Sequence, residues 1–150
     1  MHMQIAVIGK EECTDEEYEA AETAGSLIAA NHAVLCCGGR GGVMEAACKG
    51  AKGIGGTTVG ILPDRGKGNP YLDVAVRTGM GYGRNVILVE SADAVVAIGG
   101  GYGTLSEIAI ALKAGKKVFG YRTWEIEGVV KCVTPGEAVL LAAAAARQSC

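Results

Sequence analysis

Residues 93–107, DAVVAIGGGYGTLSE, decide the fold of this chain. The first six residues have the apolar, β-branched character of a strand that is buried on both faces of a sheet. Four of the next five residues are glycine, and a helical pattern follows. Residues 33–53, AVLCCGGRGGVMEAACKGAKG, repeat the same order of strand, glycine loop and helix. Such units are the building blocks of a parallel sheet.

Short apolar runs alternate with helical patterns along the rest of the chain. We expect further strands at residues 4–9, 57–62, 73–78 and 117–121, and helices at 14–32, 81–92, 103–115 and 134–148. Thr14 and Glu17 form a capping box at the start of the first helix, and Thr134 with Pro135 marks the start of the last. This alternation predicts an α/β fold, a three-layer sandwich in which a doubly wound, mainly parallel sheet lies between two helical layers. We expect residues 1–150 to form one domain.

The composition favours an oligomer and argues against nucleic-acid and membrane partners. Hydrophobic residues make up 49% of the chain and charged residues only 20%, so we expect another subunit to cover part of the surface, in a homodimer or higher homo-oligomer. The net charge is −2 and no basic run is interleaved with aromatics, which argues against DNA or RNA. No apolar stretch reaches the roughly 18 residues of a membrane span.

The six cysteines include no C-x-x-C pair. This usage argues against a zinc site and favours a reducing, cytoplasmic location. Because no other cluster of metal-ligating residues stands out, the sequence predicts neither a metal nor a resident cofactor.

Both glycine loops follow a strand and precede a helix. In a doubly wound sheet they lie at the carboxyl edge, where helix N-termini present unpaired N–H groups and a partial positive charge. Because glycine lets the backbone approach a ligand closely, two such loops at one edge are suited to phosphate. The residues of this predicted cradle are Gly38, Gly39, Arg40, Gly41, Gly42, Gly100, Gly101, Gly103 and Thr104. The alternative that the glycines only form tight turns from strand to helix stays open.

The two loops do not match the commonest nucleotide-binding motifs. Neither ends in Gly-Lys-Ser/Thr, as a P-loop does. The loop at residues 38–42 follows the second strand rather than the first, unlike a dinucleotide fingerprint. We therefore expect neither an ATPase nor a dehydrogenase.

The motifs GGRGGVMEAA (38–47) and GGGYGTLSE (99–107), with the arginine of GYGRN (81–85) between them, resemble the LONELY GUY (LOG) family. The resemblance covers nearly the whole chain and is nearest to the short branch of molybdenum cofactor carrier-like proteins. It implies a Rossmann-like α/β sandwich and a dimer or higher oligomer. Some members have been labelled lysine decarboxylases, but the sequence has no distinctive pyridoxal-phosphate signature, so we do not expect that activity.

LOG enzymes are phosphoribohydrolases, which cleave the N-glycosidic bond of a nucleoside 5′-monophosphate. The resemblance places Arg84 and Glu107 at the positions of the family's catalytic arginine and glutamate. A carboxylate held near the sugar would stabilise the positive charge that develops as the base leaves. By themselves, the residues are equally consistent with Glu107 complementing a positive helix end and with Arg84 forming an ion pair at a subunit interface.

The chain departs from the family pattern at three positions. Gly99 stands where the family's loop opens with proline, Ser106 replaces a glutamate, and Asn85 replaces a lysine. Each departure weakens the prediction of hydrolysis more than the prediction of phosphate binding.

Three functions therefore stay open. The first is a nucleoside 5′-monophosphate phosphoribohydrolase that uses Arg84 and Glu107. The second is a carrier that holds a phosphorylated pterin, such as the molybdenum cofactor, without breaking a bond. The third is a nucleotide-sensing regulator that changes its oligomeric state on binding. All three predict a small phosphorylated ligand.

Overall fold

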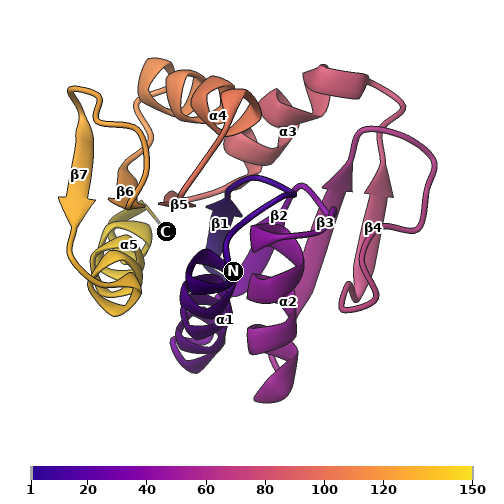
Figure 1. Cartoon of the computed structure of the whole chain (residues 1–150), viewed down its shortest axis with the longest axis horizontal. Helices are drawn as coiled ribbons and strands as arrows, with labels where there is room; N and C mark the ends of the chain where they lie inside the picture. Colours follow the sequence, from indigo (N-terminus) through magenta and orange to yellow (C-terminus); the bar gives the residue numbers. More distant parts are fainter. Residues whose placement is uncertain (1, 150) are drawn as a thin grey trace.

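A computed structural model describes residues 2–149. Within them, seven strands form one sheet in the order β4-β3-β2-β1-β5-β6-β7, and every neighbouring pair is parallel (Figure 1). The strands are β1 (Gln4–Ile8), β2 (Val34–Cys37), β3 (Thr58–Leu62), β4 (Val74–Arg77), β5 (Ala94–Ile98), β6 (Val118–Tyr121) and β7 (Val129–Cys132). The predicted parallel sheet is confirmed.

Strand β7 is the element that the sequence does not predict. It has four residues and lies at the edge of the sheet beside β6, with its two central residues exposed. Three of its four residues are apolar, but a run of four residues is too short to show the period of a strand.

Two helical layers cover the sheet. Helices α1 (Asp15–Ala30), α2 (Val43–Gly53) and α5 (Pro135–Ser149) lie on one face, and α3 (Arg84–Ser91) and α4 (Tyr102–Lys113) lie on the other (Figure 1). Alternate side chains of each strand point to opposite faces. Ile5 and Val7 therefore join the core under the first layer, while Ala6 and Ile8 join the core under the second. The predicted three-layer sandwich is confirmed.

The helix starts follow the local signals in most cases. The Glu17 N–H donates to Thr14 Oγ1 at 3.1 Å, and the Thr14 N–H donates to Glu17 Oε1 at 3.1 Å, so the capping box is confirmed. Helix α3 begins at Arg84 rather than at residue 81, because residues 81–83 form a separate 3-10 turn. Gly81 has φ +57°, which is incompatible with a right-handed α-helix.

The order of the strands creates a switch point between β1 and β5. The chain adds β2, β3 and β4 on one side of β1 and then returns to place β5 on the other side. In open α/β sheets, ligands bind outside the carboxyl ends of the strands at such a point. The loops that follow β1, β2 and β5 therefore meet at one edge.

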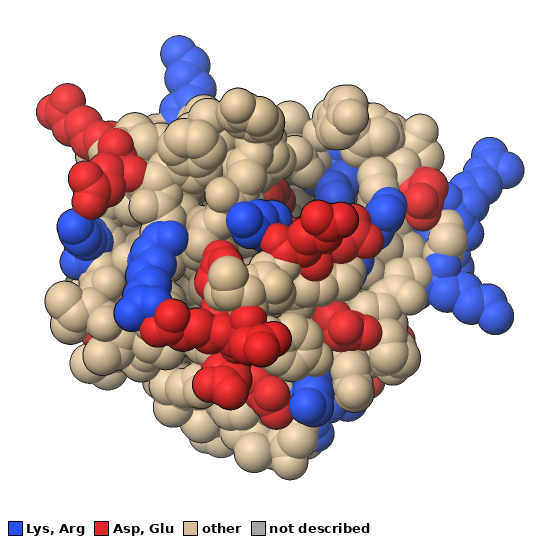
Figure 2. Space-filling view, viewed as in Figure 1, with Lys and Arg blue, Asp and Glu red and all other residues tan. Residues whose placement is uncertain are grey.

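The surface is unevenly charged. Figure 2 shows acidic side chains gathered over α1, whose first turn contains Asp15, Glu16 and Glu17. In α3, Leu88 and Val89 are buried against the sheet, whereas Val86 is 47% exposed, so the layer is open on its outer side in the single chain. Among the described helices, none has the length and apolar character needed to cross a membrane.

Two glycines set the close approach of α1 to α2. A Cβ atom on Gly25 would collide with the carbonyl oxygen of Ala47, and one on Gly50 would collide with that of Glu22. The Ser26 hydroxyl donates to the Gly50 carbonyl at 3.0 Å across the same contact. Each helix therefore packs against the backbone of the other.

We expect Gly25→Ala to lower the free energy of unfolding by about 1–3 kcal/mol, because the added methyl group overpacks this contact. Gly53→Ala is the matched control, since a Cβ atom at that helical position meets nothing within 4 Å. It should leave stability unchanged or raise it by up to about 1 kcal/mol through helix propensity. Urea unfolding measures both variants, and equal effects would contradict the close approach.

Candidate functional site

A cleft of about 500 Å³ opens at the carboxyl edge of the sheet. Segments that follow β1, β2 and β5 form its walls, together with the start of α3. The predicted site residues that line it are Arg40, Arg84, Gly101, Gly103, Thr104 and Glu107. The structure thus brings residues of both glycine loops together at one edge.

Three of the four glycines in the first loop, residues 38–42, satisfy packing demands: Gly38, Gly39 and Gly42. A Cβ atom on Gly38 would collide with the Arg84 guanidinium, and one on Gly42 would collide with the backbone carbonyls of Lys10 and Glu11. In this loop it is the Arg40 side chain, rather than the glycines, that lines the cleft. The tight-turn interpretation therefore accounts for these three glycines, whereas a Cβ atom on Gly41 would make only ordinary contacts with Glu11. Contact of any of the four with a ligand stays a prediction.

The second loop differs, because two of its glycines face open space. Gly101 and Gly103 line the cleft, and a Cβ atom on Gly103 would meet nothing within 4 Å. Helix α4 begins at Tyr102 with no side-chain cap and no acidic residue in its first turn. The Leu105 N–H is the first to find a helical acceptor, the Gly101 carbonyl at 3.0 Å. The amides of residues 102–104 are therefore left for another acceptor.

Thr104 supplies the last of these three amides. Its side chain is 2% exposed and lines the cleft, and its Oγ1 has no hydrogen-bond partner in the described part of the chain. A buried hydroxyl without a partner costs about 1–3 kcal/mol. Its methyl group lies where a Cβ atom on Gly100 would be, which explains that glycine by packing. The start of α4 thus contains a buried polar group that the protein itself does not satisfy.

Arg84 is tied to the ends of two strands. One guanidinium nitrogen donates to the Gly38 carbonyl at 2.5 Å and to the Ile61 carbonyl at 3.0 Å. Burial lowers the pKa of Arg84, and the nearby Glu107 carboxylate opposes that shift. A cation at the start of a helix opposes the helix dipole and needs a partner. In the structure, the two carbonyls are its partners and Glu107 lies beyond ion-pair distance.

Glu107 is the most buried carboxylate of the cleft. It is the sixth residue of α4, in the second turn rather than the first, and it is 7% exposed. Burial raises its pKa to about 7, and the charge of Arg84 only partly opposes that effect. Near neutral pH the carboxyl group is therefore a mixture of the neutral and charged forms, able to donate or to accept a proton.

Asn85 and Ser106 form a neutral pair beside these two residues. The Asn85 Nδ2 amide donates to Ser106 Oγ at 2.9 Å, and the Ser106 hydroxyl donates to the Gly103 carbonyl at 2.7 Å. These are two of the positions at which the sequence departs from the LOG pattern. The departures are coupled, because one hydrogen bond joins the two replacement side chains.

The charged side chains at the mouth of the cleft form ion pairs that a charged ligand can replace. Arg40 pairs with Glu11 at 3.5 Å and with Asp64 at 3.7 Å, and all three side chains are substantially exposed. Such pairs contribute little stability. Lys10 also lines the cleft, and the sequence did not predict it as a site residue. It comes just after the central strand of a doubly wound sheet, and that position in the sequence could have placed it at the cleft.

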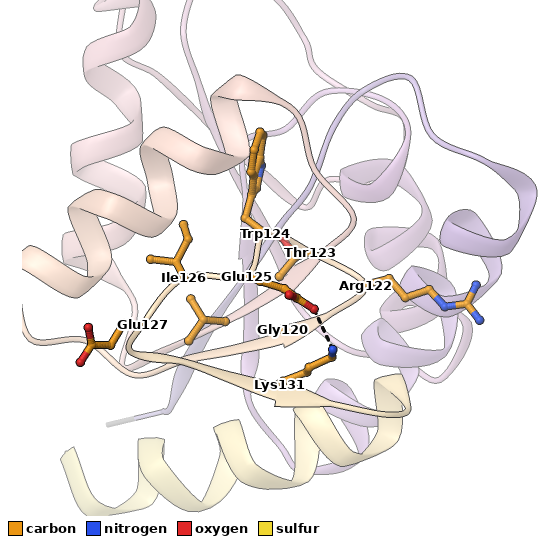
Figure 3. Close-up of a pocket in the computed structure, with 9 residues that line it drawn as sticks. Gly120, Arg122, Thr123, Trp124, Glu125, Ile126, Glu127 and Lys131 are labelled. Atoms are coloured by element: carbon orange, nitrogen blue, oxygen red, sulfur yellow. Dashed lines mark hydrogen bonds and ion pairs between the residues drawn. The ribbon is translucent and has the colours of Figure 1, made fainter.

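A second cavity of about 560 Å³ lies beside β6 and β7 (Figure 3). The loop of residues 122–127 borders it, with Lys131 paired to Glu125 at 2.7 Å. None of the predicted site residues lines it. Trp124 connects it to the cleft, because its indole N–H donates to the Gly101 carbonyl at 3.1 Å.

Within residues 2–149, no group of three or more His, Cys, Asp or Glu residues is placed to hold a metal ion.

The same fold occurs in known proteins. A model of the SLOG cluster4 family matches residues 2–147. The chain belongs to the SLOG cluster4 family. A protein from Archaeoglobus fulgidus, named an uncharacterized protein, is 52% identical over 139 residues, which cover 91% of this SLOG cluster4 chain and 92% of that protein.

Two solved structures are similar to this SLOG cluster4 protein along nearly the whole chain. The molybdenum cofactor binding protein from Rippkaea orientalis is 37% identical, with a TM-score of 0.89, and covers 94% of this chain and 95% of its own. The Moco carrier protein from Chlamydomonas reinhardtii is 31% identical, with a TM-score of 0.89, and covers 100% of both chains. The resemblance to LOG-like and carrier-like proteins that the motifs indicate is confirmed.

The raised pKa of Glu107 makes stability depend on pH. The folded chain holds the Glu107 proton up to about pH 7, whereas the unfolded chain releases it near pH 4.5. The contribution of this group to the free energy of unfolding is therefore complete below pH 4.5 and is lost as the pH rises to about 7. Because Gln does not titrate, the free energy of unfolding of Glu107→Gln should rise by roughly 3 kcal/mol relative to that of the wild type over this pH range. Urea unfolding at about pH 4, 6 and 8 measures the difference. A difference that is constant with pH would show that the carboxyl group titrates normally.

Proposed function

We propose that this chain is a carrier that holds a phosphorylated pterin of the molybdenum cofactor type in the cleft and releases it unchanged. The observation that carries the proposal is the buried, unpartnered Thr104 hydroxyl at the uncapped start of α4. The relatives support it, because one is a molybdenum cofactor binding protein and another is a Moco carrier protein. The cleft volume is also within the range of small-molecule sites.

In this proposal, the phosphate group binds at the start of α4. The unpaired amides of residues 102–104 point donors at an anion, and the helix end adds a partial positive charge. The Thr104 hydroxyl is closed to solvent in the free chain, so we propose that the first turn of α4 shifts on binding and lets this hydroxyl donate to a phosphate oxygen, the partner that it lacks. Lys10 adds a mobile positive charge at the same wall.

The neighbouring side chains favour holding a ligand over cutting it. Asn85 and Ser106 bond to each other as a neutral pair where the resemblance implies a lysine and a glutamate. The Arg84 guanidinium already donates to two carbonyls. Glu107 is partly protonated near neutral pH, which weakens it as a stabiliser of positive charge on a sugar.

Thr104→Val tests the phosphate end of the site. We expect it to weaken retention of the molybdenum cofactor about 10-fold or more, because a charge-assisted hydrogen bond is lost. The protein is mixed under anaerobic conditions with cofactor released from a molybdenum enzyme and passed through a desalting column. The retained pterin is then oxidised and measured by fluorescence.

Thr123→Val is the matched control for this variant. Thr123 Oγ1 is also buried without a partner, but it lies at the second cavity. Both substitutions remove an unsatisfied hydroxyl and should leave the unfolding free energy equal or slightly higher. Equal cofactor retention by the two variants, or none by the wild type, would contradict the proposal.

A second candidate is the phosphoribohydrolase activity that the LOG resemblance implies. The observation in its favour is that Arg84 and Glu107 line one cleft, with the pKa of Glu107 raised to about 7, where a general acid or base works best. This candidate requires the cleft to admit the sugar and base of a nucleotide as well as its phosphate.

Base release separates the two candidates. We expect the wild type to release no free base from a panel of nucleoside 5′-monophosphates over several hours, as measured by liquid chromatography. Release that is abolished in Glu107→Gln would establish the hydrolase and contradict the carrier. The Gln side chain is close in size to Glu, so the variant tests the charge and proton of the group rather than the packing of α4.

A further inference from the structure

Two largely exposed tyrosines line the cleft. Tyr82 is 95% exposed and Tyr102 is 84% exposed. They come from different elements, since Tyr82 lies in the 3-10 turn Gly81–Gly83 and Tyr102 is the first residue of α4. Aromatic rings usually bury most of their large surface, so two bare rings at one cleft are an unexplained feature of the fold.

The Tyr102 ring has a support. It stacks on Trp124 with a distance of 6.3 Å between the ring centroids and an angle of 27° between the planes. Trp124 is fixed in turn by its hydrogen bond to the Gly101 carbonyl. Figure 3 shows the Trp124 side chain extending away from the Glu125–Lys131 pair. The pair of rings therefore forms a wall that is attached to the loop at the start of α4.

The Tyr82 ring has no such support, because the residue is almost fully exposed. Glycines flank it on both sides, and Gly79 and Gly81 have φ +63° and +57°. A Cβ atom on either of these two would meet nothing within 4 Å, so packing does not require them to be small. Their positive φ angles explain why these positions are glycine, and this backbone presents the Tyr82 ring at the cleft.

We infer that Tyr82 and Tyr102 form an aromatic clamp for the flat heteroaromatic ring of the bound molecule. Tyr102 is held by Trp124, and Tyr82 is presented by the glycine turn. This inference rests on the proposed function, which places the phosphate at the amides of residues 102–104. Because Tyr102 supplies both one of those amides and the fixed ring, the phosphate and the flat ring of one ligand bind to the same turn. Stacking against an aromatic side chain is tolerant of the ring's substituents, as a carrier's site requires.

The test compares ligands with and without a flat ring. Guanosine 5′-monophosphate carries the same amino-oxo-pyrimidine edge as a pterin, and ribose 5-phosphate lacks a ring system of that kind. We expect calorimetry to give at least about 10-fold tighter binding of the nucleotide to the wild type. The chain has a single tryptophan, so the emission of Trp124 should change with the nucleotide and not with ribose 5-phosphate.

Matched substitutions assign the effect to the rings. Tyr82→Leu and Tyr102→Leu should each reduce nucleotide affinity about 5-fold or more and leave ribose 5-phosphate affinity unchanged. Tyr82→Phe and Tyr102→Phe, which keep the rings, should bind like the wild type. Both positions are so exposed that folding should be unaffected, which circular dichroism checks.

The outcomes separate this inference from the proposed function. Leu variants that bind the nucleotide as the wild type does overturn the clamp and leave the phosphate site standing. A wild type that binds neither guanosine 5′-monophosphate nor ribose 5-phosphate contradicts the phosphate site itself. The tyrosines could instead belong to a subunit interface, which sedimentation velocity tests. If the Leu variants dissociate an oligomer without a selective loss of nucleotide binding, the tyrosines belong to that interface and the clamp is overturned.

Discussion

The parallel pairing of β1 with β2 on one side and with β5 on the other is the constraint on which the cleft depends. It brings the carboxyl ends of three strands to one edge, so three loops that are far apart in the sequence share a wall. The pairing is possible because the strand side chains are apolar on both faces and each face has its own helical layer. Displacing β5 from β1 would separate the start of α4 from Lys10 and Arg40.

The two glycine loops at this edge differ in what their glycines contact. In the first loop, Gly38 makes room for Arg84, whose guanidinium joins the ends of β2 and β3 to α3. In the second loop, Gly101 and Gly103 leave the amides of α4 open to the cleft. One loop thus holds the scaffold together, and the other leaves donors unpaired. The unsatisfied Thr104 hydroxyl has a cost in the free chain that a phosphate would remove.

Buried charge is scarce in this cleft, and that scarcity bears on what the site does. The Asn85–Ser106 pair is neutral, and burial keeps Glu107 partly protonated. A site that stabilises a developing sugar cation needs a fully charged carboxylate at the reacting atoms. A site that only holds a phosphate and a flat ring needs amide donors and exposed aromatic surface, which α4 and the Tyr82 turn present.

Periodicity, local hydrogen bonds and the rules of parallel sheets are enough to predict the alternation of strands and helices, the capping box at Thr14, and the position of both glycine loops at the carboxyl edge. Strand β7 is not predicted, since its four residues, VVKC, are too few to show the period of a strand. Three features are visible only in the folded chain: Gly38 makes room for Arg84, Asn85 bonds to Ser106, and Glu107 is buried enough to raise its pKa. Those facts depend on contacts between distant segments and on exclusion of water, which no local pattern encodes.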